Sequence, residues 1–231
     1  MQKILVIASH PDDEILGAGA TFHKHVLSGD EVYCLILGHG LDARSKIIQN
    51  ELNELSLYAT NGNIHGLEKE VREAAGIIGF KENIVLSNRD NMFDTIPLLS
   101  IIKDIERHIE RWQPLIIYTH NGGDLNIDHQ RTFQAVMTAC RPGCTSVKEI
   151  YCFETPSSSE WGTESFKPNT FVEISHHDLE TKIKALECYT SEIRPYPHPR
   201  SQAGLRAHAE FYGTMAGVKL AEAFELVRCI R

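Results

Sequence analysis

Short apolar runs alternate along this chain with longer stretches in which apolar residues recur every three or four positions. The runs have the length and composition of buried strands, and the stretches have the period of amphipathic helices. The sequence predicts strands at 3–8, 31–37, 83–86, 114–118, 148–153 and 170–174. It predicts helices at 15–26, 43–60, 67–78, 96–112, 178–190 and 201–227, with a further helix that begins near Gln130. This alternation is typical of an α/β fold, and we expect one Rossmann-like three-layer domain with a mostly parallel sheet over residues 1–231.

The first polar cluster, His10-Pro11-Asp12-Asp13-Glu14, follows the strand predicted at 3–8. Ligands of open α/β sheets collect at the carboxyl ends of strands, so these side chains are expected in a crevice. An imidazole and a carboxylate can hold a divalent metal, and a second carboxylate can act as a base on water. A plain helix cap explains one or two of the acidic residues but not the histidine.

A second cluster, Thr119 to His129, follows the strand predicted at 114–118 and contains two histidines, two aspartates and two asparagines. Both clusters fall on the same edge of the predicted sheet, where their side chains can converge. The alternative is an Asn/Gly/Asp turn in which Asp128 caps the next helix. Together the clusters favour a mononuclear metal site with two histidine ligands and one aspartate, the composition of hydrolytic zinc centres.

The first cluster, together with the later Asp-His pair, resembles the PIG-L/LmbE superfamily of zinc-dependent N-acetylglucosamine deacetylases. Weaker similarity covers most of the chain, at Glu70 to Gly79, Asp90 to Asp94, Pro197 to Ser201 and Ala221 to Phe224. The resemblance implies one zinc ion per chain. Its ligands would be His10, Asp13 and His129, and Asp12 would be the general base.

Two positions depart from the family pattern. Asn126 stands where the family often has a histidine, and its amide can donate a hydrogen bond to an oxyanion but cannot carry a charge. Leu67 replaces a family arginine, and Arg44 is a candidate to take over that substrate contact.

The resemblance implies a hydrolase that removes the N-acetyl group from an N-acetylglucosamine-type sugar or sugar conjugate. Asp128 is expected to orient a ligand or the base. His198, which lies between two prolines, is a candidate general acid or an ordinary loop residue. The candidate substrate-binding residues are Arg44, Asp90, Trp161 and Arg200, although Trp161 and Arg200 equally suit a surface loop and a surface ion pair. Two alternatives stay open: an amidase or deacetylase for another N-acyl glycoside, such as a thiol-precursor sugar, and a non-catalytic sugar-binding relative.

Composition narrows the expected partners. The net charge is −8 over 231 residues, which disfavours nucleic acid because phosphate binding needs clustered Lys and Arg. Acidic residues before Gly17-Ala18-Gly19 also disfavour a nucleotide cofactor. The chain has no 18-residue apolar stretch and no export signal, so we expect a cytoplasmic protein with reduced cysteines and no membrane span. The expected partner is a small amino sugar, and a homo-oligomer stays open.

Overall fold

The computed structural model describes residues 1–39 and 60–231, with side chains described from residue 67 onward in the second range. The helix predicted at 43–60 and the candidate Arg44 therefore lie outside the described residues, apart from Thr60. The strands are β1 Lys3–Ala8, β2 Glu31–Gly38, β3 Glu82–Asn88, β4 Ile116–His120, β5 Glu149–Phe153, β6 Thr170–Glu173 and β7 Ala221–Cys229. The helices are α1 Asp13–Leu27, α2 Thr60–Ile78, α3 Leu98–Trp112, α4 Ile127–Ala139, α5 His176–Glu187 and α6 Gln202–Ala216, with short 3-10 turns η1 Phe93–Thr95 and η2 Ser159–Trp161.

The seven strands form one sheet in the order β3-β2-β1-β4-β5-β7-β6. The first five of these strands are parallel, and β7 runs antiparallel to both β5 and β6. The chain leaves β1 toward β2 on one side and later returns to β4 on the other side. The sheet therefore has its topological switch point between β1 and β4, where α/β proteins bind ligands.

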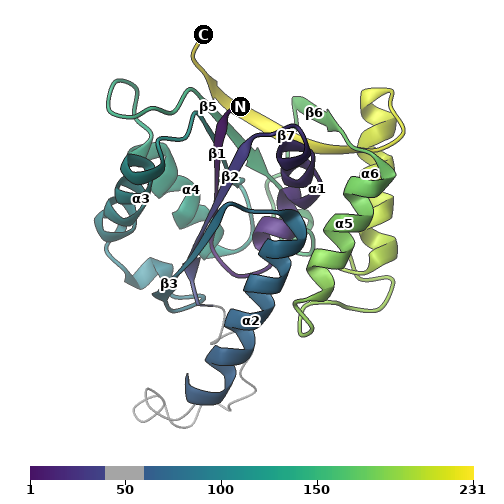
Figure 1. Ribbon diagram of the computed structural model, residues 1–231, viewed down its shortest axis with the longest axis horizontal. Coiled ribbons are helices and arrows are strands. Elements are labelled where there is room, and N and C mark those ends of the chain that lie inside the picture. The colour runs from purple at the N-terminus through teal and green to yellow at the C-terminus, as the bar shows by residue number, and fades with distance from the viewer. Residues whose placement is uncertain (40–59) are drawn as a thin grey trace.

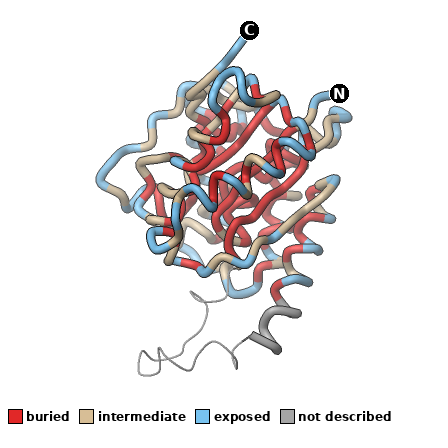
Figure 2. The backbone as a smooth tube through the Cα atoms, turned by 90° about the vertical axis from the view of Figure 1, so that its left-hand side faces the viewer, coloured by how far each residue is buried: buried red, intermediate tan, exposed pale blue. Residues whose placement is uncertain are grey.

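Helices cover both faces of this sheet, as the ribbon shows (Figure 1). One apolar core joins Ile4 and Val6 of β1 to helices α1, α2, α5 and α6. The other core joins Leu5 and Ile7 of the same strand to α3 and α4. Alternate strand residues thus point to opposite faces, and the strands run through the most buried part of the protein (Figure 2). The expected three-layer α/β fold with a mostly parallel sheet is confirmed.

The end of the chain corrects the sequence prediction. The single helix predicted at 201–227 is wrong: α6 ends at Ala216, and Ala221–Cys229 forms strand β7. Gly217 takes a left-handed conformation with φ of 73°, which ends the helix and is easily reached only without a side chain. The apolar residues beyond it, including the fully buried Phe224, then pack between β5 and β6 rather than continuing a helical face.

Two element boundaries near the second cluster also differ from those predicted from the sequence. Strand β4 runs to His120, so His120 belongs to the strand and not to the loop after it. Helix α4 begins at Ile127, three residues before Gln130, because Asn126 caps it. His129 therefore lies in the first turn of a helix.

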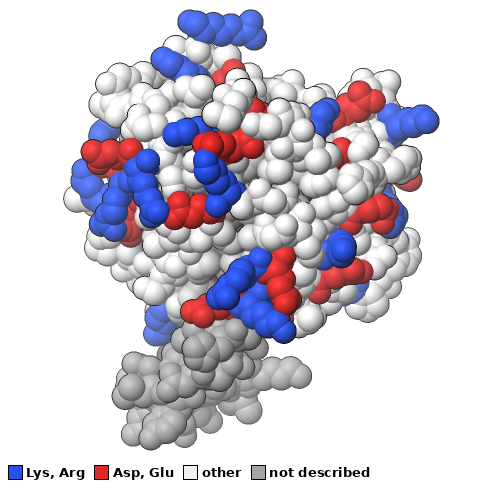
Figure 3. Space-filling model, viewed as in Figure 1, with Lys and Arg blue, Asp and Glu red and all other residues white. Residues whose placement is uncertain are grey.

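The charged side chains on the face shown in Figure 3 are mixed in sign, with basic and acidic groups adjacent at several places. Oppositely charged side chains also form ion pairs, such as Arg206 with Glu180. Among the described helices, none has both the length and the apolar character that crossing a membrane requires.

Candidate metal centre

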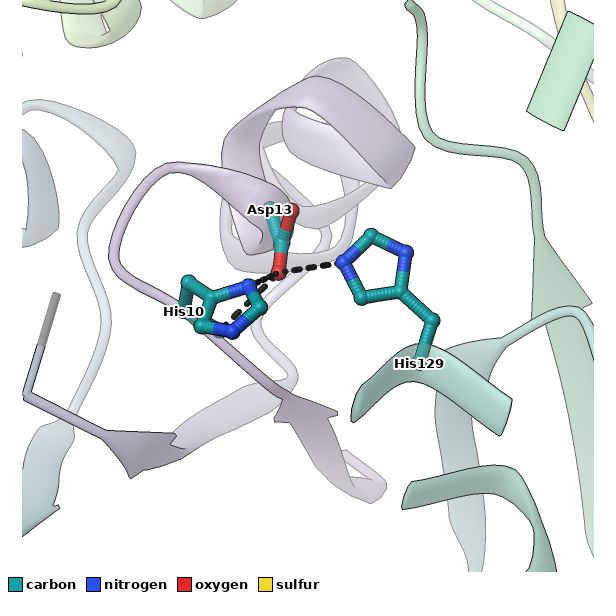
Figure 4. Close-up of side chains that lie close together, drawn as sticks. All are labelled: His10, Asp13 and His129. Atoms are coloured by element: carbon teal, nitrogen blue, oxygen red, sulfur yellow. Dashed lines mark hydrogen bonds and ion pairs between the residues drawn. The ribbon is translucent and has the colours of Figure 1, made fainter. Parts of the chain in front are cut away.

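Three potential metal ligands meet at the switch point of the sheet (Figure 4). His10 follows β1, Asp13 is the first residue of α1, and His129 lies in the first turn of α4. Strands β1 and β4 pair directly, with Ile7 beside Thr119, so both loops leave the sheet at one place. The fold brings together residues more than 100 positions apart in the chain.

One carboxylate oxygen is the meeting point of this group. Oδ2 of Asp13 lies 3.2 Å from Nδ1 of His10 and 3.2 Å from Nε2 of His129. One ligand atom from each residue lies within 4.8 Å of the other two, which is close enough for a single ion to contact all three. Asp13 and His129 are buried and His10 is partly exposed, so the group opens to solvent on one side.

The state of His129 fits a metal ligand. Both of its ring nitrogens are buried, and neither has a hydrogen bond of good geometry to another described residue. Carboxylate oxygens of Asp13 and Asp124 nevertheless lie 3.2 Å and 3.0 Å from them. A buried imidazole normally completes its hydrogen bonds, and a cation shared with Asp13 would satisfy Nε2. Two histidines and one aspartate with an open side are a donor set that suits zinc.

Each histidine also has a carboxylate behind it. Oδ2 of Asp128 lies 2.8 Å from Nε2 of His10, and Oδ1 of Asp124 lies 3.0 Å from Nδ1 of His129. The amides of Asn91 and Phe93 donate to Asp128, and the hydroxyls of Ser158 and Ser159 donate to Asp124. Such outer carboxylates fix the ring orientation of metal-binding histidines.

The charges of these carboxylates set the protonation of the group. Burial disfavours a charged His10, but hydrogen bonds to Asp128 and Asp13 outweigh it and raise the pKa of His10 to about 10. Burial likewise opposes a charged His129, yet Asp13 and Asp124 raise its pKa to about 9. Burial alone would raise the pKa of Asp13, but the charge of His129 holds it well below the usual range. Both imidazoles therefore favour the protonated form when no metal is bound, and a cation would compete with these protons.

Asp12 is held apart from the three ligands. Its backbone has φ of 113°, a conformation that residues other than glycine rarely adopt. The carboxylate of Glu14 accepts a hydrogen bond of 3.0 Å from the Asp12 amide and one of 2.6 Å from the hydroxyl of Tyr189. Burial raises the pKa of Glu14 to about 7. Nη1 of Arg200 donates to Oδ2 of Asp12 at 2.8 Å and to Glu192 at 2.6 Å. This turn is strained, and buried partners hold it in place.

Two buried residues of the site were not among the sequence candidates. Asp124 is the partner of His129. His120, fully buried at the end of β4, stacks on His129 with ring centroids 3.9 Å apart. Nε2 of His120 accepts from the amide of Ser9 at 2.9 Å, and burial together with the charge of His129 lowers its pKa to about 3, so this ring is neutral. Their place in the polar cluster was a signal, but only the fold shows which side chains they face.

A cleft of about 920 Å³ opens over these residues. Asp90, Asn126, Trp161 and Arg200 line it together with the three ligands and Asp12. His198 is not among its described lining residues: its Nδ1 accepts the Arg200 amide at 3.1 Å, and its ring packs edge-on against Trp161. The structure thus brings most of the described sequence candidates to one cleft and leaves His198 beside it.

Comparisons with known proteins find relatives in sequence and in fold. The sequence model of one protein family, GlcNAc-PI de-N-acetylase (PIG-L), matches residues 5–140. The uncharacterized deacetylase YaiS of Escherichia coli K12 is 28% identical over 193 residues, which cover 81% of this chain and 90% of that protein. Diacetylchitobiose deacetylase of Thermococcus kodakarensis is 27% identical over 242 residues, covering 98% of this chain and 84% of that protein. The structure of N,N'-diacetylchitobiose deacetylase from Pyrococcus horikoshii superposes with a TM-score of 0.75 and 24% identity, covering 98% of this chain and 84% of that one.

The protonation of the group predicts how metal binding depends on pH. Since His10 and His129 hold protons up to pH 9 to 10 in the metal-free site, a cation must displace both, and affinity should rise with pH. We expect zinc affinity, measured by competition with a chelating dye between pH 6 and 8, to strengthen by up to about 100-fold per pH unit. His25→Gln, which alters an imidazole paired with Asp30 outside the site, should leave this slope unchanged. A zinc affinity that is independent of pH would contradict the assignment of His10 and His129 as metal ligands.

Proposed function

The chain belongs to the PIG-L family of GlcNAc-PI de-N-acetylases, and on that premise we propose that it is a zinc-dependent hydrolase that removes the N-acetyl group from an N-acetylglucosamine-type sugar or sugar conjugate. The observation that carries the proposal is the convergence of His10 and His129 on one oxygen of Asp13, with a second carboxylate, Asp12, in the same cleft. We also propose that residues 1–231 act as one deacetylase domain, because strands from Lys3 to Cys229 join a single sheet.

In this proposal His10, Asp13 and His129 hold one zinc ion. When bound, zinc supplies a Lewis acid that polarises the acetyl carbonyl and makes a water molecule acidic near neutral pH. Asp128 accepts a hydrogen bond from Nε2 of His10, and Asp124 lies 3.0 Å from Nδ1 of His129; these two carboxylates help to keep the opposite ring nitrogens directed at the ion. His120 packs flat against His129 and limits its rotation.

Asp12 is proposed as the general base. The guanidinium of Arg200, 2.8 Å away, favours the ionised carboxylate and restricts its orientation. Asp12 accepts a proton from the attacking water and then delivers it to the departing amine, which is a poor leaving group without protonation. The same residue can serve both steps, so the reaction does not require His198, which lies outside the cleft lining.

The rest of the cleft supports binding of a sugar. Trp161 is 59% exposed and offers an aromatic surface on which a sugar ring can pack. Asp90 is a candidate acceptor for sugar hydroxyls. The cleft volume of about 920 Å³ is near the upper end of the range for ligand pockets, about 300–1,000 Å³, so it suits a conjugate larger than one ring.

The test is acetate release from a panel of N-acetylated amino sugars, including free, disaccharide and glycoside-linked forms, with zinc-loaded and chelator-treated protein. We expect activity only with metal. Asp12→Asn should keep zinc but lower turnover by about 100-fold or more, the usual contribution of a positioned acid–base group. A zinc-loaded Asp12→Asn protein with normal turnover would exclude this role, and a wild-type protein that binds these sugars without releasing acetate would indicate a binding protein instead.

Asn126 provides a separate prediction. Its Oδ1 accepts a hydrogen bond from the amide of Asp128 at 2.8 Å and so caps α4. Its Nδ2 makes a long contact of 3.5 Å with Oδ1 of Asn91, which leaves this donor available to an oxyanion. Asn126→Ala should lower turnover by roughly 10-fold to 1,000-fold, the scale of losing one oxyanion donor, and should cost about 1 kcal/mol of stability from the lost cap. Asn126→Ser keeps a capping oxygen without the amide.

The two variants separate the roles of the side chain. If Asn126 donates to the oxyanion, turnover falls in both variants while the melting temperature falls mainly in Asn126→Ala. Normal turnover in both variants, at full zinc content, would show that the residue serves only as a helix cap.

A further inference from the structure

Helix α1, which begins with Asp13, is interrupted near its middle. Ala18 has φ of −152° and ψ of 24°, values outside the helical range, so Asp13–Gly17 and the residues after Ala18 form two helical segments. The interruption at Ala18 lies five residues after Asp13 and six after Asp12. Breaks of this kind have identifiable causes, among them side chains that insert between the turns.

Two side chains from distant elements occupy this break. Nζ of Lys182, from α5, donates to the carbonyl oxygen of Leu16 at 2.8 Å. The carboxylate of Glu222, from β7, accepts the amides of Ala20 at 3.4 Å and Thr21 at 2.7 Å. In an unbroken helix the Leu16 carbonyl and the Ala20 amide would bond to each other. Lys182 and Glu222 therefore take over the backbone groups that the break leaves unpaired.

The two side chains also pair with each other inside the protein. Nζ of Lys182 lies 2.6 Å from Oε1 of Glu222, and both residues are less than 10% exposed, at 7% and 6%. Burying two charges costs desolvation free energy, which hydrogen bonds to the ends of the helical segments help to offset. Apolar residues would fill the same space without that cost, but they could not bond the broken backbone.

The first segment of α1 has other fixed contacts. A Cβ atom on Gly17 would lie 2.2 Å from the ring of Phe153 in β5, so the segment sits directly against the sheet there. The carboxylate of Glu14 accepts from Tyr189 at 2.6 Å. Contacts to other elements thus set the direction of this short segment, and the second segment does not have to continue it.

We propose that Lys182 and Glu222 are positioning residues of the metal site: by holding the two ends of the break in α1, they direct its first turn and so place Asp12 and Asp13. The inference rests on the proposed function for the chemistry of those two carboxylates, whereas the placement of the turn can be measured without any substrate. Neither residue is among the described residues that line the catalytic cleft, so both act through α1.

The test compares Lys182→Met and Glu222→Gln with His23→Gln. The Glu222→Gln amide keeps an oxygen acceptor for Thr21 and is expected to fold. His23 is a buried residue of the second α1 segment whose Nδ1 contacts Asp178 of α5 at 2.7 Å, so its replacement disturbs the same packing on the far side of the break. For each protein we would measure melting temperature, zinc affinity by chelator competition, kcat and KM.

We expect both variants at the break to bind zinc about 10-fold to 100-fold more weakly, the range for residues that orient metal ligands, and to lose kcat with little change in KM. His23→Gln should change only the melting temperature. Folded Glu222→Gln protein with wild-type zinc affinity and kcat would overturn the proposal. If Lys182→Met does not fold, the result for Glu222→Gln alone decides whether the proposal holds.

A measurement on metal-free protein separates this inference from the proposed function. The amides of Ile15 and Leu16 donate to the carbonyl of Asp12, at 3.0 Å and 2.8 Å, and their hydrogen exchange reports the first turn. Faster exchange in the variants at the break, but not in His23→Gln, supports positioning even if wild-type protein releases no acetate. Unchanged exchange rejects positioning even if the protein proves to be an active deacetylase.

Discussion

The structure depends on keeping one buried carboxylate, that of Asp13, at the point where two parallel strands end. A buried charge is tolerated only with partners, and Oδ2 of Asp13 has the amide of His10 at 2.9 Å as well as the imidazoles of His10 and His129. Each imidazole is backed in turn by its own aspartate. The result is a pre-formed cluster of alternating negative and positive groups, and under the proposed function a divalent cation would replace two of its protons.

Several features of the fold, some near the cluster and some farther away, position its residues. The switch between β1 and β4 brings the two polar loops together, and the cap at Asn126 starts α4 early enough to place His129 in its first turn. The break in α1 lets Asp13–Gly17 take its own direction against the sheet. Strain at Asp12 is held by Glu14 on one side and by Arg200 on the other. Under the proposed function, Asp12 is separate from the metal ligands and already oriented, which suits a residue that transfers a proton during amide hydrolysis.

Much of this was predictable from the sequence, for a physical reason. The expected sheet and the convergence of the two polar clusters follow from local periodicity and from the rule that parallel strands end at one edge. The choice of His10, Asp13 and His129 within those clusters came from the family resemblance. Pairings such as Asp124 with Ser158, Asp12 with Arg200 and Lys182 with Glu222 join residues 34, 188 and 40 positions apart, and no local pattern encodes them. The end of the chain was mistaken for a helix because its apolar residues continued the preceding pattern. The left-handed conformation of Gly217 ends α6, and the place between β5 and β6 in the sheet is filled by β7; both are visible only in the structure.

The most direct test of the account is anomalous diffraction from crystals of the zinc-loaded protein, measured on both sides of the zinc absorption edge. The account predicts one peak per chain, about 2.0–2.2 Å from a nitrogen of His10, an oxygen of Asp13 and Nε2 of His129, with the Asp12 carboxylate outside the coordination shell. A strong peak at other residues, a peak coordinated by Asp12 in place of Asp13, or no peak at this site would contradict it.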